Sequence, residues 1–168
     1  MPYSDHFKLA DDLLAHIEPV VAGLQDPFLQ SRYTGFISVA GVTVYELAIK
    51  QIFCDFGAAK HKVLGAFTES YFERLNGRIK YEVLHSEYVE RFGDKYVRKF
   101  KHGVKKRNDA YLREHRKDIL TCYNNLITWR NQFAHEGILP ANATFSDTVE
   151  AYQLGKFVLE CLANAMRR

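Results

Sequence analysis

Apolar residues recur at helical spacing through most of the chain, and this pattern predicts an all-helical protein. The apolar face of one predicted helix contains Cys122, Leu126, Trp129 and Phe133. Asp118 caps or opens this helix, and Gly137, with Pro140 soon after it, stops it. We call it the motif helix, because its last turns carry the most informative residues of the chain.

A second long helix is predicted to begin at Pro27, with Asp26 as its cap, and to run to about Phe56. It is apolar on most sides, which is typical of either a buried central helix or a membrane span. Three charged residues within it, Arg32, Glu46 and Lys50, favour the buried central helix.

Four further helices are expected from the same periodicity. The first begins at Ser4 or Asp5 and ends near Gly23. Two shorter helices occupy 61–77 and 78–92, with Asn76-Gly77 as the turn between them. The first of these is expected to direct inward Val63, Leu64, Phe67, Tyr71, Phe72 and Leu75. The last helix begins at Ser146 or Asp147 and closes the bundle.

Composition is that of a globular protein with one core. The chain has 168 residues and a formal net charge of only +3. Three cysteines, each within an apolar helical pattern and none in a Cys-x-x-Cys pair, indicate buried thiols in a reducing compartment. The start of the chain has no apolar signal region, so we expect a cytoplasmic protein that does not enter a membrane.

Positive charge is concentrated in residues 95–117, where ten basic residues stand against two acidic ones. The residues most suited to contact a phosphate backbone are Lys99, Lys101, Lys105, Lys106 and Arg107. Aromatic residues are interleaved with them, and Gly103 suggests a break in the segment. Two interpretations remain open, an RNA-binding surface and a solvated basic connector.

The polar side of the motif helix carries Asn124, Thr128, Asn131 and His135 and no charge other than a protonated imidazole. Such a stripe suits a half-buried cleft or a subunit seam better than a solvated face. Asn131 lies four residues before His135, so its amide can orient the imidazole. Arg130 lies about 140° around the helix from His135. The two side chains can meet only if the last turn opens before Gly137 or if a second copy of the chain brings its own pair.

Arg130-Asn131-x-x-x-His135 at the end of an apolar helix resembles the signature of the HEPN superfamily. The resemblance implies a bundle of four core helices that dimerises around the motif helix. Many such domains are metal-independent endoribonucleases of toxin–antitoxin and phage-defence systems, with the active site where two protomers meet. The whole chain, 1–168, would then be one HEPN-like domain, with 60–117 as a helical and basic insertion.

The resemblance implies roles for particular residues. His135 would act as the general base or acid, because an imidazole titrates near cellular pH. Arg130 would bind the phosphate and its transition state, and Asn131 would fix the imidazole. Glu46 is either paired with Lys50 one turn away or a supporting acid that holds Arg130 or His135. Cleavage would use the ribose 2′-OH and leave 2′,3′-cyclic phosphate ends.

No cofactor is expected, and no metal motif such as His-x-x-x-His or phosphate-binding glycine loop occurs in the sequence. The expected partners are RNA, a second copy of the chain, and a cognate antitoxin or a nucleotidyltransferase-type protein. Two other interpretations remain: a non-catalytic HEPN-like module that binds nucleotides, nucleic acid or a protein partner, and a plain helical dimerisation protein.

Overall fold

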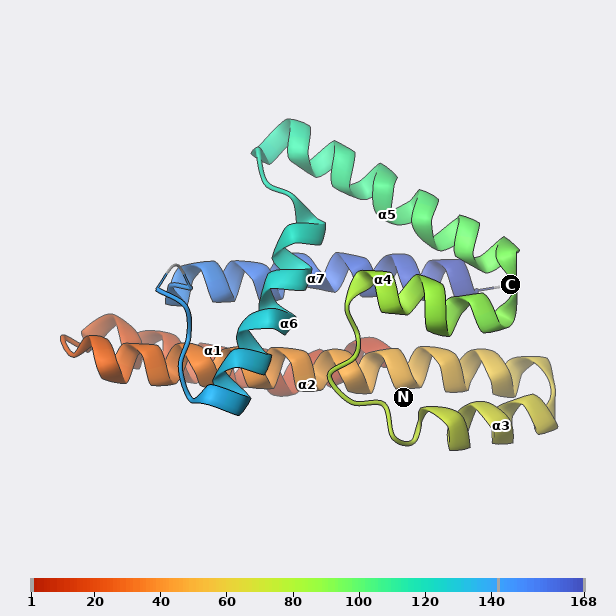
Figure 1. The fold of residues 1–168 in the computed structure, drawn as a ribbon, viewed down its shortest axis with the longest axis horizontal. Coiled ribbons are helices and arrows are strands. Elements are labelled where there is room, and N and C mark those ends of the chain that lie inside the picture. Colours follow the sequence, from red (N-terminus) through yellow and green to blue (C-terminus); the bar gives the residue numbers. More distant parts are fainter. Residues whose placement is uncertain (1, 142, 168) are drawn as a thin grey trace.

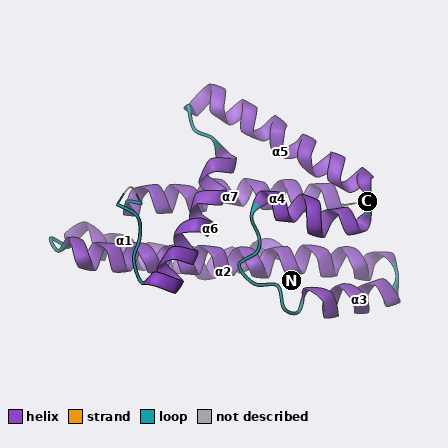
Figure 2. Cartoon of the chain, viewed as in Figure 1, coloured by secondary structure: helices purple, strands orange, loops and turns teal. Residues whose placement is uncertain are grey.

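The computed structural model describes residues 2–141 and 143–167, and this part of the chain is helical with no strand. The helices are joined by short connections (Figure 2). Their bounds are η1 Tyr3–His6, α1 Phe7–Gly23, α2 Pro27–Lys60, α3 Lys62–Phe72, α4 Tyr81–Val83, η2 Leu84–Tyr88, η3 Val89–Phe92, α5 Asp94–His115, α6 Ile119–Glu136 and α7 Phe145–Met166. The predicted all-α fold is confirmed.

Helix α2 is the centre of the bundle. It begins as expected, with the Asp26 side chain accepting a hydrogen bond from the backbone N–H of Phe28 and Pro27 in the first turn. It packs against α1, α3, α6 and α7. By length and composition α2 could span a membrane, but 56% of its most apolar window is buried within the protein. More than half of that window therefore packs into the core, as expected of a central helix.

Three tyrosines join the central helices. Tyr45 of α2 stacks between Tyr123 of α6 and Tyr152 of α7, with ring centroids 5.7 and 5.8 Å away. Each hydroxyl has a partner, as a buried hydroxyl requires: Tyr45 donates to the Tyr152 carbonyl, Tyr123 to the Ile79 carbonyl, and Tyr152 to Asp11. Burial raises the pKa of all three, so they remain neutral hydrogen-bond donors.

Helix α6 crosses the bundle, and the two ends of this helix lie in different surroundings. In Figure 1, α1, α2 and α7 follow the long axis, and α6 runs across them. Its first turn follows the end of α5, and its last turn extends below α2 in this view. The fold thus places the basic segment and the Arg130–His135 motif at opposite ends of one helix.

Several local expectations were wrong. Helix α1 follows a short 3-10 turn, without a side-chain cap from Ser4 or Asp5. Helix α3 ends at Phe72, because residues 73–80 form a loop before the helical segment 81–92 begins. Val63, Phe67 and Tyr71 are exposed, not inward.

The basic segment and the last helix also differ from the prediction. Helix α5 continues through Gly103, where it packs near Cys161 of α7, so this glycine is no break. Thr144, not Ser146 or Asp147, begins α7, and its hydroxyl accepts a hydrogen bond from the Asp147 backbone.

Candidate functional site

Helix α6 is fixed at both ends by the residues that the sequence indicates. The Asp118 carboxylate accepts a hydrogen bond from the Thr121 backbone, and Gly137 ends the helix in the left-handed region at φ 68°. Burial alone would raise the pKa of Asp118, but hydrogen bonds from Asn108 and Thr121 outweigh it and lower that pKa. The helix stays regular to Glu136, so its last turn does not open to bring Arg130 and His135 together.

Arg130 lies in a half-buried group of interacting residues, which we call the Arg130 cluster: Glu46, Gly77, Arg130 and Asn131. Its Nη2 atom is 3.2 Å from Oε1 of Glu46, and its Nη1 atom donates to Oδ1 of Asn131 at 3.0 Å. The side chains of Arg130 and Glu46 are 22% and 16% exposed. The guanidinium is thus held in place while one side remains open to solvent.

Glu46 is paired with Arg130; among the described residues it forms no ion pair with Lys50. Burial raises the pKa of its carboxyl, although the Arg130 charge and a hydrogen bond from the Gly77 backbone act in the opposite direction. The carboxylate is therefore a desolvated acceptor whose charge depends on Arg130. Its role as a supporting acid stays a prediction.

His135 lies outside this cluster. It is exposed in the last turn of α6, and within the described part of the chain no hydrogen bond joins it to Asn131. The expected amide–imidazole contact is not made, because the Asn131 oxygen accepts from Arg130 instead. The structure groups Arg130, Asn131 and Glu46, and leaves His135 separate on the surface.

A second arginine, not singled out by the sequence pattern, secures the same end of the helix. Arg32 of α2 donates from Nη1 to the Gly137 carbonyl at 2.5 Å. Its guanidinium lies over the rings of Phe28 at 4.6 Å and Phe133 at 5.9 Å. A cation at this position is favourable because the carbonyls that end a helix carry partial negative charge.

The five predicted RNA-binding residues lie on α5 and divide between two faces. Lys99, Lys106 and Arg107 line a groove against α7, and Lys101 and Lys105 line one towards Tyr81 and Leu120. Arg107 is also paired with Glu160 at 3.5 Å and lies 4.1 Å from the Phe157 ring centroid. From the α5 end of α6, Arg130 is about 18 Å further along the helix axis.

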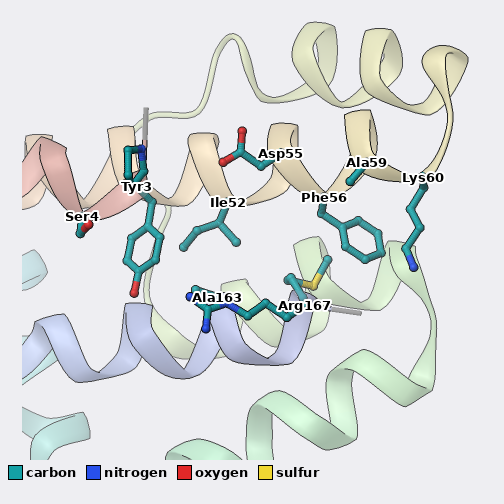
Figure 3. Close-up of a pocket in the computed structure, with 11 residues that line it drawn as sticks. Tyr3, Ser4, Ile52, Asp55, Phe56, Ala59, Lys60, Ala163 and Arg167 are labelled. Carbon is teal, nitrogen blue, oxygen red and sulfur yellow. The ribbon is translucent and has the colours of Figure 1, made fainter.

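A separate cavity of about 480 Å³ lies between η1, the last turns of α2 and the end of α7 (Figure 3). Its wall combines Tyr3, Ile52 and Phe56 with the charged groups of Asp55 and Lys60. It contains no residue of the Arg130 cluster and no histidine, so it is not part of the candidate site.

The arrangement of helices agrees with a known family. The family model described as RiboL-PSP-HEPN matches residues 4–167. The chain belongs to this family. No curated protein matches the chain, and no solved structure does. The predicted HEPN membership is confirmed, and HEPN domains are often ribonucleases; the match shows neither the Arg130–His135 motif as a signature nor catalytic activity.

Gly77 is the cluster residue that sequence reasoning missed as part of the site. The pair Asn76-Gly77 was recognisable as a turn, but no pattern in the sequence indicates where that turn packs. Helical periodicity assigns faces within a helix, whereas the contact between a loop and a helix more than 50 residues later is tertiary. Arg32 was noticed as a charge within α2, again without its partner.

Proposed function

We propose that this HEPN domain is a metal-independent endoribonuclease that acts as a homodimer. The observation that supports it most is the division of the motif: Arg130 is held by Glu46 and Asn131, and His135 is exposed. Because Arg130 and His135 lie on different sides of a regular helix, a cleavage site needs Arg130 of one copy and His135 of another.

The chemistry follows from the two side chains. The exposed imidazole removes the proton from a ribose 2′-OH, or protonates the leaving oxygen. The fixed guanidinium binds the phosphate oxygens as negative charge develops on them. Since Arg130 is already ordered by two neighbours, binding a phosphate costs little further side-chain entropy. The products carry 2′,3′-cyclic phosphate ends, and DNA is not cut because it lacks the hydroxyl.

Exposed apolar side chains at the same end of the molecule support a second copy there. We call Phe28, Phe36, Phe133 and Ile138 the Phe36 patch. The Phe36 and Phe133 ring centroids are 5.8 Å apart, and the Arg32 guanidinium lies over the rings of both Phe28 and Phe133. Phe28, Phe36 and Ile138 are exposed in the single chain. Burial of this patch against its symmetry mate would provide apolar contact area beside both motifs.

RNA incubated with chelator tests the proposal. Wild type should cut and leave cyclic phosphate ends, whereas Arg130→Ala and His135→Ala should each lose roughly 100-fold or more in kcat. Matched controls are Arg91→Ala and His16→Ala, which alter exposed residues of η3 and α1 away from the motif and should leave cutting unchanged. Equal cutting by all four variants would reject Arg130 and His135 as the catalytic pair.

A non-catalytic binding module is the second candidate. The observation that favours it is that Glu46 and Asn131 already engage Arg130, as they would in a purely structural ion pair. In that case RNA would bind with a strong dependence on salt and would stay intact. The biological setting that we propose is a cytoplasmic toxin–antitoxin or phage-defence system, with a cognate antitoxin or nucleotidyltransferase-type protein as partner.

A further inference from the structure

The loop of residues 73–80 lies directly against the Arg130 cluster. A Cβ atom added to Gly77 would be 2.5 Å from Nη1 of Arg130 and 3.3 Å from Oδ1 of Asn131. The first distance is well below any normal contact, so a side chain at this position would have to displace the Arg130 guanidinium. The backbone N–H of Gly77 also hydrogen-bonds the Glu46 carboxylate.

Space, not backbone conformation, is the reason for this glycine. Among the described residues the glycines with positive φ are Gly93 and Gly137, and Gly77 is not one of them. An alanine could therefore adopt the Gly77 backbone without strain, and its methyl group would collide only with Arg130 and Asn131. The close approach brings the loop backbone against one side of the guanidinium.

The loop is attached to the same helix that carries Arg130. The Tyr123 hydroxyl donates to the Ile79 carbonyl at 2.6 Å, and the Tyr81 N–H donates to Oδ1 of Asn124 at 3.1 Å. Tyr123 and Ile79 are fully buried. Tyr123 and Asn124 precede Arg130 by about two helical turns, so loop and guanidinium share one rigid support.

We propose that residues 76–81 are a positioning element of the ribonuclease site, with Gly77 as its contact to Arg130. This inference rests on the proposed function. The loop and Glu46 enclose the guanidinium from two directions, and Asn131 engages one of its edges. Within the described residues the other guanidinium donors make no hydrogen bond and the side chain is partly exposed, so these donors can serve a phosphate. Part of the segment expected to be an insertion thus belongs to the site.

Gly77→Ala is the direct test, with Gly23→Ala as its matched control. The control residue has open space around its Cβ position and no positive φ. Because displacement of a catalytic group by about 1 Å can cost on the order of 100-fold, Gly77→Ala should lower kcat at least tenfold. KM for RNA should change less than about twofold, because the basic face of α5 is untouched. Gly23→Ala should leave both constants at the wild-type values.

A second variant keeps the test decisive if Gly77→Ala does not fold. Tyr123→Phe keeps the buried ring and removes only the hydroxyl that holds the Ile79 carbonyl. It should lower kcat several-fold, again without a comparable change in KM. If Tyr123→Phe acted only by destabilising the fold, it would lower the fraction of folded, active protein. The apparent loss of kcat would then vanish when kcat is calculated per folded molecule.

Thermal melting separates this inference from the proposed function. Gly77→Ala should lower Tm in the wild-type background and lower it less in an Arg130→Ala background, where the colliding atom is gone. If wild type never cuts RNA, the proposed function fails, and this double-mutant cycle alone decides whether Gly77 contacts Arg130 as described. Wild-type cutting with kcat unchanged by Gly77→Ala, or Tm losses that simply add, would overturn the inference.

Discussion

The two ends of helix α6 present positive charge to the solvent in opposite ways. At its beginning lies α5, whose many lysines and arginines are exposed and few of which have a fixed partner. Near its end lies Arg130, which is mostly buried and is held by Glu46 and Asn131, while the Gly77 backbone in turn hydrogen-bonds Glu46. Exposed, mobile cations attract a polyanion through their number, whereas an ordered guanidinium acts through its position. The predictions below separate these two effects.

Arg130→Lys should give the largest effect of the charge-conserving changes. The lysine keeps a positive charge but lacks the planar fork that reaches Glu46 and Asn131 together. We expect kcat to fall on the order of 100-fold and KM to change little. An equivalent change on α5, Lys106→Arg, should leave both constants nearly unchanged. If Arg130→Lys were as active as wild type, Arg130 would act by its charge alone, as the α5 cations are expected to do.

Interruption of the Phe36 patch should be nearly as severe if two copies are required. Phe36→Glu places a charge where we expect apolar burial, so it should convert a dimer to a monomer and lower cutting at least tenfold. The matched control is Leu9→Glu, which places the same charge at an exposed apolar residue of α1, outside the patch. Sedimentation or light scattering reports the mass; a fully active Phe36→Glu monomer would contradict the need for a second copy.

Neutralising the α5 cations should change binding and leave the chemical step alone. Lys99, Lys106 and Arg107 changed together to alanine should weaken RNA binding roughly tenfold or more and reduce its salt dependence, with kcat preserved at saturating RNA. The pair Lys101 and Lys105 face another groove, so the same change there shows which face the RNA follows. Unchanged salt dependence in both variants would make α5 a solvated connector.

Glu46→Gln should produce a smaller and pH-dependent effect. The amide keeps the size of the side chain but not its charge, so Arg130 is held less firmly and kcat should fall several-fold. Since the folded-state pKa of Glu46 is raised, its contribution to stability is complete below its ordinary value of 4.5 and is lost as pH rises through the folded value. The free energy of unfolding, measured across this pH range, should rise in the variant relative to wild type as pH rises.

Asp118→Asn should give the smallest effect, at the opposite end of α6. Asparagine is also a good helix cap, so stability at neutral pH should change by less than about 1 kcal/mol. The folded-state pKa of Asp118 is lowered, so its contribution is present above its ordinary value of 3.8 and is lost as pH falls through the folded value. As pH falls, the stability of the variant should therefore decrease less steeply than that of wild type. Identical dependence on pH in the two proteins would contradict a lowered pKa for Asp118.

Sequence periodicity was sufficient for the all-helical fold, for the start of α2 and for the limits of α6, because caps, stops and apolar faces are local signals. It was insufficient where tertiary contacts decide. The exposed faces of Val63 and Phe67 follow from the way α3 packs on α2, and α5 continues through Gly103 as it packs along α7. The same limit applies to the site: the motif was visible in the sequence, but the position of Gly77 beside Arg130 was not.

Mixing two inactive variants tests the central claim most directly. Arg130→Ala and His135→Ala proteins, each unable to cut RNA, are unfolded and refolded together so that their subunits exchange. If each site takes Arg130 from one copy and His135 from the other, every mixed dimer contains one intact site. The mixture should then recover roughly a quarter of wild-type activity. No recovery, with subunit exchange confirmed by mass, would contradict a site shared between two copies.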